Sequence, residues 1–298
     1  MNIKLNSEIS DALRGRRPVV ALESTVIAHG LPYPQNLETA LKLESIVRDN
    51  GAIPATIAVF GGEFYVGLER DQIERLATET EIRKISRRDL PVAVAMKLDC
   101  ATTVATTAFI AHRAGIKVFA TGGIGGVHRG FSADTSADLP ELAQTPITVV
   151  CSGAKIVLDL ERTREWLETH GITVLGWKCD ELPAFYSRTS GLAIDERIET
   201  AEDAAAIIAA RDELGMKNAI LVTVPVPRDF EIDRSELELI LAAAIKLAHE
   251  KGVGGKEITP FLLAQMSERS GGRTLAANIA LLENNASVAA EISLKLSQ

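Results

Sequence analysis

The sequence predicts an α/β protein, a single three-layer α/β/α domain over residues 1–298 with a mainly parallel or mixed central sheet. Three observations support this prediction. Short apolar runs alternate with longer amphipathic stretches along most of the chain, as in layered α/β domains. Several of these runs lack alternating polar residues, which is typical of strands covered on both faces. No stretch rich in serine, glycine or proline divides the chain, so we expect one domain.

The apolar runs that predict strands are rich in valine, isoleucine and alanine. They are Val19–Leu22, Thr56–Phe60, Val92–Met96, Val118–Thr121, Ile147–Cys151, Thr173–Leu175 and Ala219–Val224. Gly61 and Gly62 follow the second run and predict a hairpin that returns through Phe64.

Helices are predicted where apolar residues recur three or four positions apart. These stretches are Pro34–Arg48, Ala101–Ala114, Asp159–Thr169, Ala201–Leu214, Ser235–Lys251 and Pro260–Ser287. A proline begins the first and the last of them, as suits the first turn of a helix. Gly115 and Gly171 stand where glycine caps the carboxyl end of a helix.

Charge and composition limit the class of protein. The 298 residues include 32 Lys and Arg against 40 Asp and Glu, a formal net charge of −8. Because a basic surface is lacking, we expect neither nucleic acid nor an anionic membrane as a partner. The first ten residues lack the apolar stretch of a secretory signal, and the longest apolar runs are too short for a membrane span. Three cysteines without CxxC spacing predict reduced thiols and a cytoplasmic protein.

The first candidate site follows the strand predicted at 19–22. Glu23, Ser24 and Thr25 come directly after it, and His29 lies a few residues further on. Ligands of open α/β sheets bind at the carboxyl ends of strands. A carboxyl group buried there has a raised pKa and suits proton transfer near neutral pH. The residues alone leave open whether Glu23 or Ser24 simply caps the next turn.

A glycine cluster, with the sequence GGIGG at residues 122–126, follows another predicted strand. Glycine amides approach a ligand closely and together bind an anionic oxygen. The spacing differs from the dinucleotide fingerprint, which requires glycine where His128 stands, and the chain has no P-loop motif. A tight structural turn is the alternative, and the adjoining His128 and Arg129 favour a ligand.

Asp134 and Asp138 form a third candidate site, with Ser136 between them. Two carboxylates four residues apart suit a hydrated divalent cation such as Mg²⁺ or Mn²⁺, or a sugar hydroxyl. A short helix capped by Ser136, with Asp138 in its first turn, explains the same residues equally well.

Lys155 is the fourth candidate. It follows the strand predicted at 147–151 and stands among small and aliphatic residues. A lysine that burial deprives of water becomes a neutral amine, able to attack a carbonyl-like carbon. The alternative is a solvated surface lysine.

Two further segments suit anions. Residues 83–89 (RKISRRD) are cationic in an otherwise acidic protein, and they predict either phosphate binding or a solvated loop. The glycine-rich loop at 252–260 enters a predicted helix and is a second candidate for an anion.

Taken together, these segments resemble the pseudouridine-5′-phosphate glycosidase family, also called the indigoidine synthase A-like family. The resemblance covers nearly the whole chain, because many long motifs occur in the same order. They are ALESTVIAHGLPYPQN (21–36), PATIAVFGG (54–62), SRRDLP (86–91), ATTVATT (101–107), KVFATGGIGGVHRG (117–130), SADL (136–139), CSGAK (151–155), LPAFYSRTSG (182–191), GKEITPFLL (255–263) and NIALLENNA (278–286).

The resemblance implies an enzyme that reversibly cleaves the carbon–carbon glycosidic bond of pseudouridine 5′-phosphate to uracil and ribose 5-phosphate. It implies a homotrimer that uses Mn²⁺ or a similar divalent cation, one per subunit. Lys155 would be the nucleophile that forms an imine with the ring-opened sugar, Glu23 the proton donor and Asp134 the metal ligand. The residues that would contact the substrate are Lys84, Thr103, Val104, Thr121, His128, Ser136, Ala137, Asp138 and Asn278.

Two alternatives remain open. The first is a lysine-imine lyase that acts on another C-nucleoside or on a pigment precursor. The second is a non-catalytic sensor of sugar phosphates, against which the presence of both Glu23 and Lys155 speaks.

Overall fold

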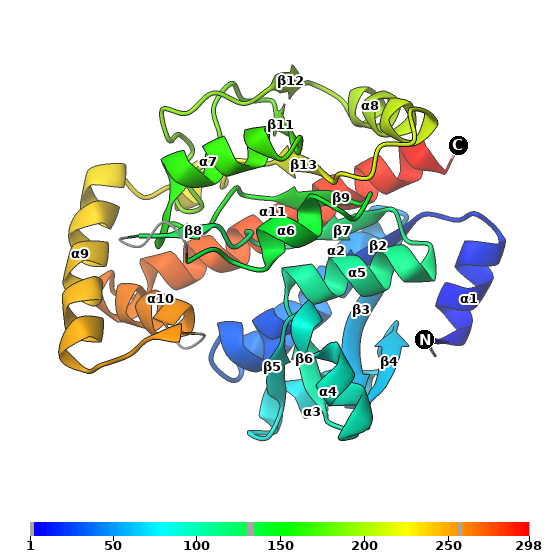
Figure 1. The fold of residues 1–298 in the computed structure, drawn as a ribbon, viewed down its shortest axis with the longest axis horizontal. Coiled ribbons are helices and arrows are strands. Elements are labelled where there is room, and N and C mark those ends of the chain that lie inside the picture. The colour runs from blue at the N-terminus through cyan, green and yellow to red at the C-terminus, as the bar shows by residue number, and fades with distance from the viewer. Residues whose placement is uncertain (1–2, 130–133, 256–257, 298) are drawn as a thin grey trace.

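The computed structural model describes residues 3–129, 134–255 and 258–297, which fold around one large sheet (Figure 1). Its strands run in the order β1-β4-β3-β2-β7-β9-β13-β11-β12, and β5 and β6 join it beside β3. The strands are β1 (Ile3–Leu5), β2 (Val19–Leu22), β3 (Ile53–Phe60), β4 (Glu63–Val66), β5 (Arg83–Ile85), β6 (Cys100–Thr102), β7 (Val118–Ala120), β9 (Thr148–Cys151), β11 (Thr173–Trp177), β12 (Glu196–Ile198) and β13 (Ile220–Thr223). Two short strands, β8 (Val127–His128) and β10 (Leu158–Asp159), pair separately.

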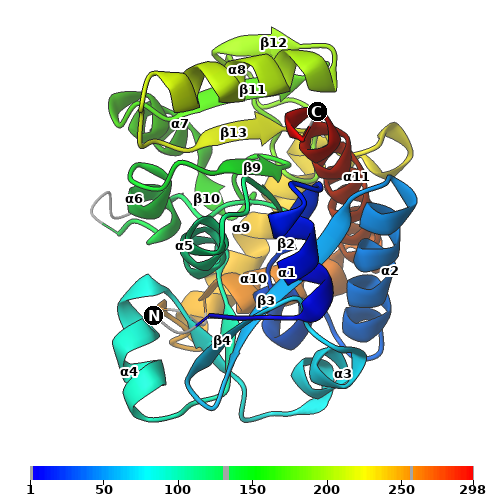
Figure 2. The ribbon, with the colours of Figure 1, turned by 90° about the vertical axis from the view of Figure 1, so that its right-hand side faces the viewer.

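Helices cover both faces of this sheet. Figure 2 shows α5, α6 and α7 on one side, and α2 and the long α11 on the other. The α-helices are α1 (Ser7–Arg14), α2 (Gln35–Asp49), α3 (Arg70–Thr78), α4 (Leu90–Ala95), α5 (Val104–Ala114), α6 (Asp138–Leu142), α7 (Leu160–Thr169), α8 (Ala201–Glu213), α9 (Arg234–Glu250), α10 (Ile258–Arg269) and α11 (Arg273–Leu296). The predicted α/β class and its layers are confirmed.

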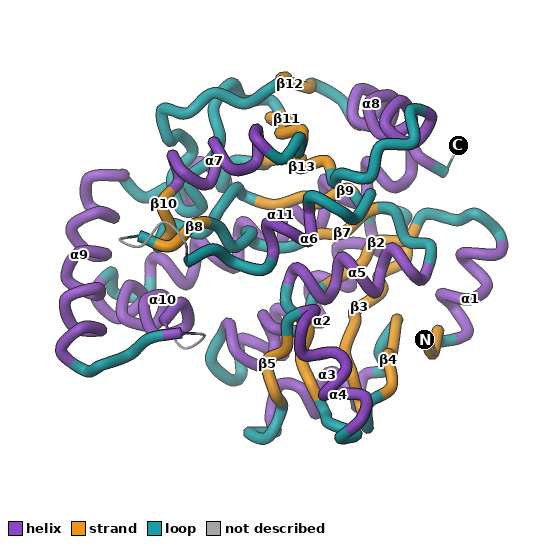
Figure 3. The backbone as a smooth tube through the Cα atoms, in the orientation of Figure 1, coloured by secondary structure: helices purple, strands orange, loops and turns teal. Residues whose placement is uncertain are grey.

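The centre of the sheet is parallel and buried, which explains its unbroken apolar sequences. Every residue of β2, β7, β9 and β13 is buried. Their parallel pairing places Leu22, Ala120 and Cys151 at the same carboxyl edge. The residues that follow these strands therefore meet there, and Figure 3 shows α9 and α10 as a helical pair beyond the sheet on that side.

Two local expectations are confirmed. β3 and β4 form the antiparallel hairpin, and Gly61 and Gly62 have φ of +59° and +77°, the left-handed conformation that a two-residue turn needs. Gly115 ends α5 with φ of +90°. Within the described residues, no helix combines the length and the apolar character that a membrane crossing requires.

Three predicted elements were wrong. Residues 92–95 belong to α4 instead of a strand, and Met96 caps this helix. Pro91 stands in its first turn, where proline is favoured, and Val92 and Val94 stay 46% and 45% exposed. In the predicted helix at 101–114, the first two residues belong to strand β6, and the helix α5 begins only at Val104. The predicted helix at 260–287 is two helices, since Gly271 and Gly272, with φ of +62° and +83°, break it.

Candidate active site

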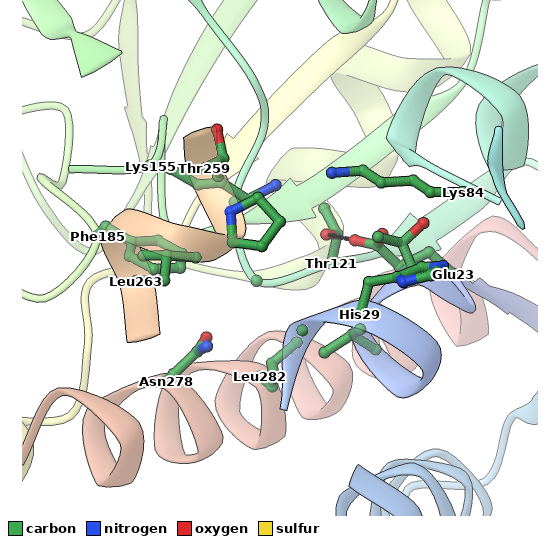
Figure 4. Close-up of a pocket in the computed structure, with 16 residues that line it drawn as sticks. Glu23, His29, Lys84, Thr121, Lys155, Phe185, Thr259, Leu263, Asn278 and Leu282 are labelled. Carbon is green, nitrogen blue, oxygen red and sulfur yellow. Dashed lines mark hydrogen bonds between the residues drawn. The ribbon is translucent and has the colours of Figure 1, made fainter. Parts of the chain in front are cut away.

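A cavity of about 60 Å³ lies at the carboxyl edge of the sheet, where the ends of β2, β7 and β9 meet (Figure 4). Side chains from both ends of the sequence line it. Its lining residues are Glu23, Thr25, Val26, His29, Gly30, Lys84, Thr121, Gly122, Gly123, Lys155, Phe185, Thr259, Pro260, Leu263, Asn278 and Leu282. A larger cavity of about 570 Å³ adjoins it and shares five of these residues, among them Asn278 and Leu263.

Glu23 directly follows β2, and its side chain is almost completely buried, with the residue 9% exposed. The hydroxyl of Thr121, at the end of β7, donates a hydrogen bond to its carboxylate. Burial raises the pKa of Glu23, and the nearby Lys155 and the Thr121 hydrogen bond oppose this rise. The structure therefore places a buried carboxyl group at the end of β2, where the sequence predicted one.

Lys155 lies in the loop after β9, and its backbone is tied to the glycine cluster. Its amide donates to the Ile124 carbonyl (3.1 Å), and the Ile124 amide donates to the Gly153 carbonyl (3.0 Å). Gly153 has φ of +78°, and a Cβ there would lie 2.2 Å from the Pro183 carbonyl oxygen. Glycine is therefore required for the turn that delivers Lys155 to the cavity.

Asp138, in the first turn of α6, holds the glycine cluster from behind. Its two carboxylate oxygens accept hydrogen bonds from the amides of Ala105 (2.9 Å) and Gly125 (2.8 Å). The Ser136 hydroxyl accepts from the Asp138 amide (3.3 Å), so the helix-start interpretation is correct in outline, although Ala137 occupies the cap position. Backbone amides thus occupy both oxygens of Asp138.

Lys84 enters the cavity from the other side, from β5. Figure 4 shows its amine and that of Lys155 pointing toward each other across the cavity, with Glu23 and Thr121 joined nearby. Both lysines act electrostatically on Glu23. One carboxyl group and two amines, which lie far apart in the sequence, thus line the same small cavity.

The predicted site residues divide into three groups. Glu23, Lys84, Thr121, Lys155 and Asn278 line the cavity. The second group stands behind it, around the glycine cluster and the start of α5, and consists of Thr103, Val104, Ser136, Ala137 and Asp138.

The third group, His128 and Asp134, lines a neighbouring cavity of about 230 Å³ together with Arg129 and His249. Thr259 lines both this cavity and the first one. Among the described residues, no three His, Cys, Asp or Glu side chains form a group able to hold a metal ion. An ion on the exposed Asp134 would therefore keep most of its water, as Mg²⁺ and Mn²⁺ do.

Sequence reasoning missed three contributors. Phe185, with φ of +63°, and Leu263, from α10, form apolar walls of the cavity. Asn285, fully buried in α11, donates hydrogen bonds to the carbonyl of Thr121 (2.8 Å) and to the hydroxyl of Ser152 (3.1 Å). The sequence carries one signal for Asn285: an asparagine within an apolar helical stretch is expected to be buried and hydrogen-bonded.

The two predicted anion segments have different outcomes. In the segment 83–89, Lys84 lines the cavity, whereas the Arg87 guanidinium forms an ion pair with Glu141 (2.7 Å). In the loop 252–260, Lys256 and Glu257 lie outside the described residues, and Thr259 and Pro260 line the cavity.

Comparison with known proteins identifies the family to which this chain belongs. The family model described as indigoidine synthase A like protein matches residues 8–295. The chain belongs to the indigoidine synthase A-like family.

Relatives in this family are similar over their whole length. The pseudouridine-5′-phosphate glycosidase of Caldanaerobacter subterraneus subsp. tengcongensis is 52% identical, covering 99% of this chain and 97% of its own. That of Clostridium botulinum is 51% identical with the same coverage. Among solved structures, the prealnumycin C-glycosynthase AlnA, in complex with ribulose 5-phosphate, is 40% identical with a TM-score of 0.92, covering 100% of this chain and 97% of its own. An indigoidine synthase A-like protein from Thermotoga maritima is 38% identical with the same TM-score and coverage.

Proposed function

We propose that this family member is an enzyme that reversibly cleaves the carbon–carbon glycosidic bond of pseudouridine 5′-phosphate to uracil and ribose 5-phosphate. One observation supports this most directly: a buried carboxyl, Glu23, and an amine, Lys155, face the same small cavity. The relatives that are about half identical over the full chain carry the name of this activity.

In the proposed reaction, protonated Glu23 gives its proton to the ring oxygen of the ribose as the bond from that oxygen to C1′ breaks. The Lys155 amine then adds to C1′, and the bond from C1′ to the base breaks while the base carbon takes up a proton. An imine joins Lys155 to C1′, and water hydrolyses it to ribose 5-phosphate and free lysine. The neutral form of Glu23, which burial favours, is the form that this first step needs.

The remaining lining residues bind the substrate in this proposal. Lys84 supplies a positive charge for the phosphorylated sugar, and Thr121 and Asn278 supply hydrogen bonds. Ser136 and Asp138 act through the glycine cluster, to which they are hydrogen-bonded at Gly126 and Gly125. Thr103, Val104 and Ala137 remain predicted substrate contacts in this proposal. His128, in the adjoining cavity, contacts the distal part of the substrate.

The decisive experiment is reductive trapping. Borohydride added with ribose 5-phosphate is expected to fix a covalent adduct on Lys155, located by peptide mass spectrometry. Lys155→Ala is expected to bind the substrate while turnover falls by about a thousandfold or more, because the loss affects the chemical step. Lys117→Ala, at an exposed lysine paired with Asp212, serves as the control and keeps its turnover. An unmodified Lys155 peptide under these conditions contradicts the mechanism.

We also propose that Asp134 holds one Mn²⁺ or similar divalent ion, with water as its other ligands. Such an ion would supply positive charge beside the phosphorylated sugar. Removal of metal by a chelator is expected to lower activity, and added Mn²⁺ to restore it. Electron paramagnetic resonance measures Mn²⁺ binding directly, and Asp134→Asn should weaken it. Equal binding by Asp134→Asn and wild type contradicts the assignment.

For the assembly and the compartment, we propose a homotrimer in the cytoplasm. Cys100, Cys151 and Cys179 are all free, which suits a reducing compartment. Sedimentation analysis of the 32.0 kDa chain tests the trimer.

A second candidate is synthesis of a C-glycosidic bond to another acceptor. The similarity to the C-glycosynthase AlnA favours it, although the identity of 40% is lower than that to the glycosidases. Release of uracil from pseudouridine 5′-phosphate distinguishes the first candidate from this one.

A further inference from the structure

Lys84 is carried by a weakly supported part of the fold. Its strand, β5, is three residues long and, among the described strands, pairs with β6 alone. The helix that follows, α4, buries only Leu90 and Ala93 and leaves Val92 and Val94 nearly half exposed. Short edge strands and thinly packed helices move most easily, so the position of Lys84 depends on the few contacts that hold this segment.

The Ile85 carbonyl of β5 accepts hydrogen bonds from the Thr106 hydroxyl (3.0 Å) and the Thr103 amide (3.2 Å) at the start of α5, and the contact of this segment with α6 runs through Arg87. Arg87, one short turn after Lys84, forms an ion pair with Glu141 of α6 (2.7 Å), whose side chain is 1% exposed. The guanidinium also lies over the ring of Phe109 in α5, 4.7 Å from its centroid. The second oxygen of Glu141 accepts a hydrogen bond from Thr145, so both oxygens of this buried carboxylate have partners.

Glu141 lies on the same short helix as Asp138, one turn further on. Asp138 binds the amides of Ala105 and Gly125, and the loop of Gly125 is in turn bonded to that of Lys155. Helix α6 therefore bonds, through two carboxylates, to the segments that carry the two lysines of the cavity. One leads to the glycine cluster and Lys155, and the other leads to Arg87 and the segment of Lys84.

We propose that Arg87 and Glu141 are positioning residues, which fix the Lys84 amine relative to Lys155 by tying the β5 segment to α6. This inference rests on the proposed function, because it concerns binding of the same substrate. Neither residue lines the cavity, so their effect passes through Lys84. Glu23 directly follows β2 and Lys155 lies in the loop after β9, and both are central, fully buried strands that contain neither Arg87 nor Glu141.

The test compares Arg87→Met, Glu141→Gln and their double variant in steady-state kinetics with pseudouridine 5′-phosphate. Each single variant is expected to raise KM about tenfold, the loss of one charged hydrogen bond, while kcat changes less than twofold. Since the two residues act as one unit, the double variant should equal the worse single variant. Arg75→Met is the matched control, because its ion pair with Asp99 supports the strand next to β5 but does not reach α6, and its KM should stay unchanged.

A cycle with Lys84→Met separates positioning from mere stability. In that background, Arg87→Met should cause no further rise in KM, because the group it positions is already gone. The inference is overturned if the rise in KM of the Lys84→Met, Arg87→Met double variant is the product of the two single rises. An Arg87→Met variant with a lowered Tm and an unchanged KM overturns it as well. Arg87→Lys retains the charge and should give an intermediate KM if the methionine variant does not fold. A wild type that releases no uracil overturns the proposed function and this inference together, whereas an active wild type with unaffected variants overturns only the inference.

Discussion

Opposing effects determine the pKa of the Glu23 carboxyl group. Burial at the end of β2 favours its neutral form, and Lys155 and the Thr121 hydroxyl favour the carboxylate. Because burial has the largest effect, the pKa stays above the ordinary value of a glutamate. A proton donor near neutral pH needs this result, and a glutamate in solvent does not provide it.

Thr121→Val is expected to shift the pH dependence of kcat/KM. Its hydrogen bond stabilises the carboxylate of Glu23, so its loss raises the pKa of Glu23 further. In the proposed mechanism Glu23 acts in its protonated form, so activity is expected below this pKa and is expected to be lost as pH rises through it. The alkaline limb of the pH–rate profile should therefore move to higher pH.

Thr56→Val provides the control for this prediction. Thr56 likewise donates to a carboxylate, that of Glu44 (2.6 Å), but neither residue lines the cavity. Its alkaline limb should match that of the wild type. If Thr121→Val leaves the alkaline limb of the pH–rate profile in place, or moves it to lower pH, then Glu23 is not the group that titrates.

At the scale of elements, the site depends on loops that are shaped by close contacts. A Cβ at Gly125 would lie 2.1 Å from the Ser136 hydroxyl oxygen and 2.7 Å from a carboxylate oxygen of Asp138. The loop after β7 can therefore approach α6 only because this residue is glycine. The glycine cluster serves first to fit the loop between α5, α6 and the loop of Lys155.

Gly125→Ala is expected to lower kcat/KM by about a hundredfold, since a displacement on the order of 1 Å in a catalytic loop has this effect. It should also lower the Tm, because the Asp138 carboxylate loses its hydrogen bond to the loop. In Gly254→Ala the added Cβ meets no atom within 4 Å, so this variant should retain its Tm. Wild-type kinetics in Gly125→Ala would contradict the role given to the contact.

At the scale of the whole molecule, α11 runs between the carboxyl edge of the sheet, where the cavity lies, and the carboxyl terminus of the chain. It packs against β2, β7 and β9, and it also contributes Asn278 and Leu282 to the cavity. Through Asn285 it binds the Thr121 carbonyl and the Ser152 hydroxyl, which belong to the loops after β7 and β9. The last helix thus holds together two loops that precede it by more than a hundred residues.

Asn285→Ala is expected to lower the free energy of unfolding by about 2–3 kcal/mol, because it leaves buried polar partners without a hydrogen bond. It should also lower kcat, since Thr121 and the loop of Lys155 lose a shared support. Denaturant unfolding and steady-state kinetics measure both effects. The neighbouring Asn284→Ala removes only a long hydrogen bond to the Pro225 carbonyl (3.3 Å), so it should change the free energy of unfolding and kcat much less. Equal effects of the two variants would contradict this role of Asn285.

Much of this molecule could be predicted from local sequence. The central strands are recognisable because burial on both faces requires apolar residues throughout, as in Val19–Leu22. Prediction failed where a local pattern had two readings. Residues 92–96 are apolar and include the β-branched Val92 and Val94, yet residues 92–95 belong to a helix with Pro91 in its first turn. The break at Gly271 and Gly272 is hidden within a long helical periodicity.

By itself, the sequence determined the layered α/β class, the elements of the sheet centre and the residue types of the site, because each follows from local periodicity or from motifs shared with a family. Only the tertiary structure decided which of these side chains meet. It brought Lys84 from an edge strand to face Lys155, gave both oxygens of Asp138 to backbone amides, and placed His128 and Asp134 in an adjoining cavity. The reason is physical: distances between side chains depend on the pairing order of strands and on buried polar contacts between remote segments, and neither is encoded in any single stretch of the chain.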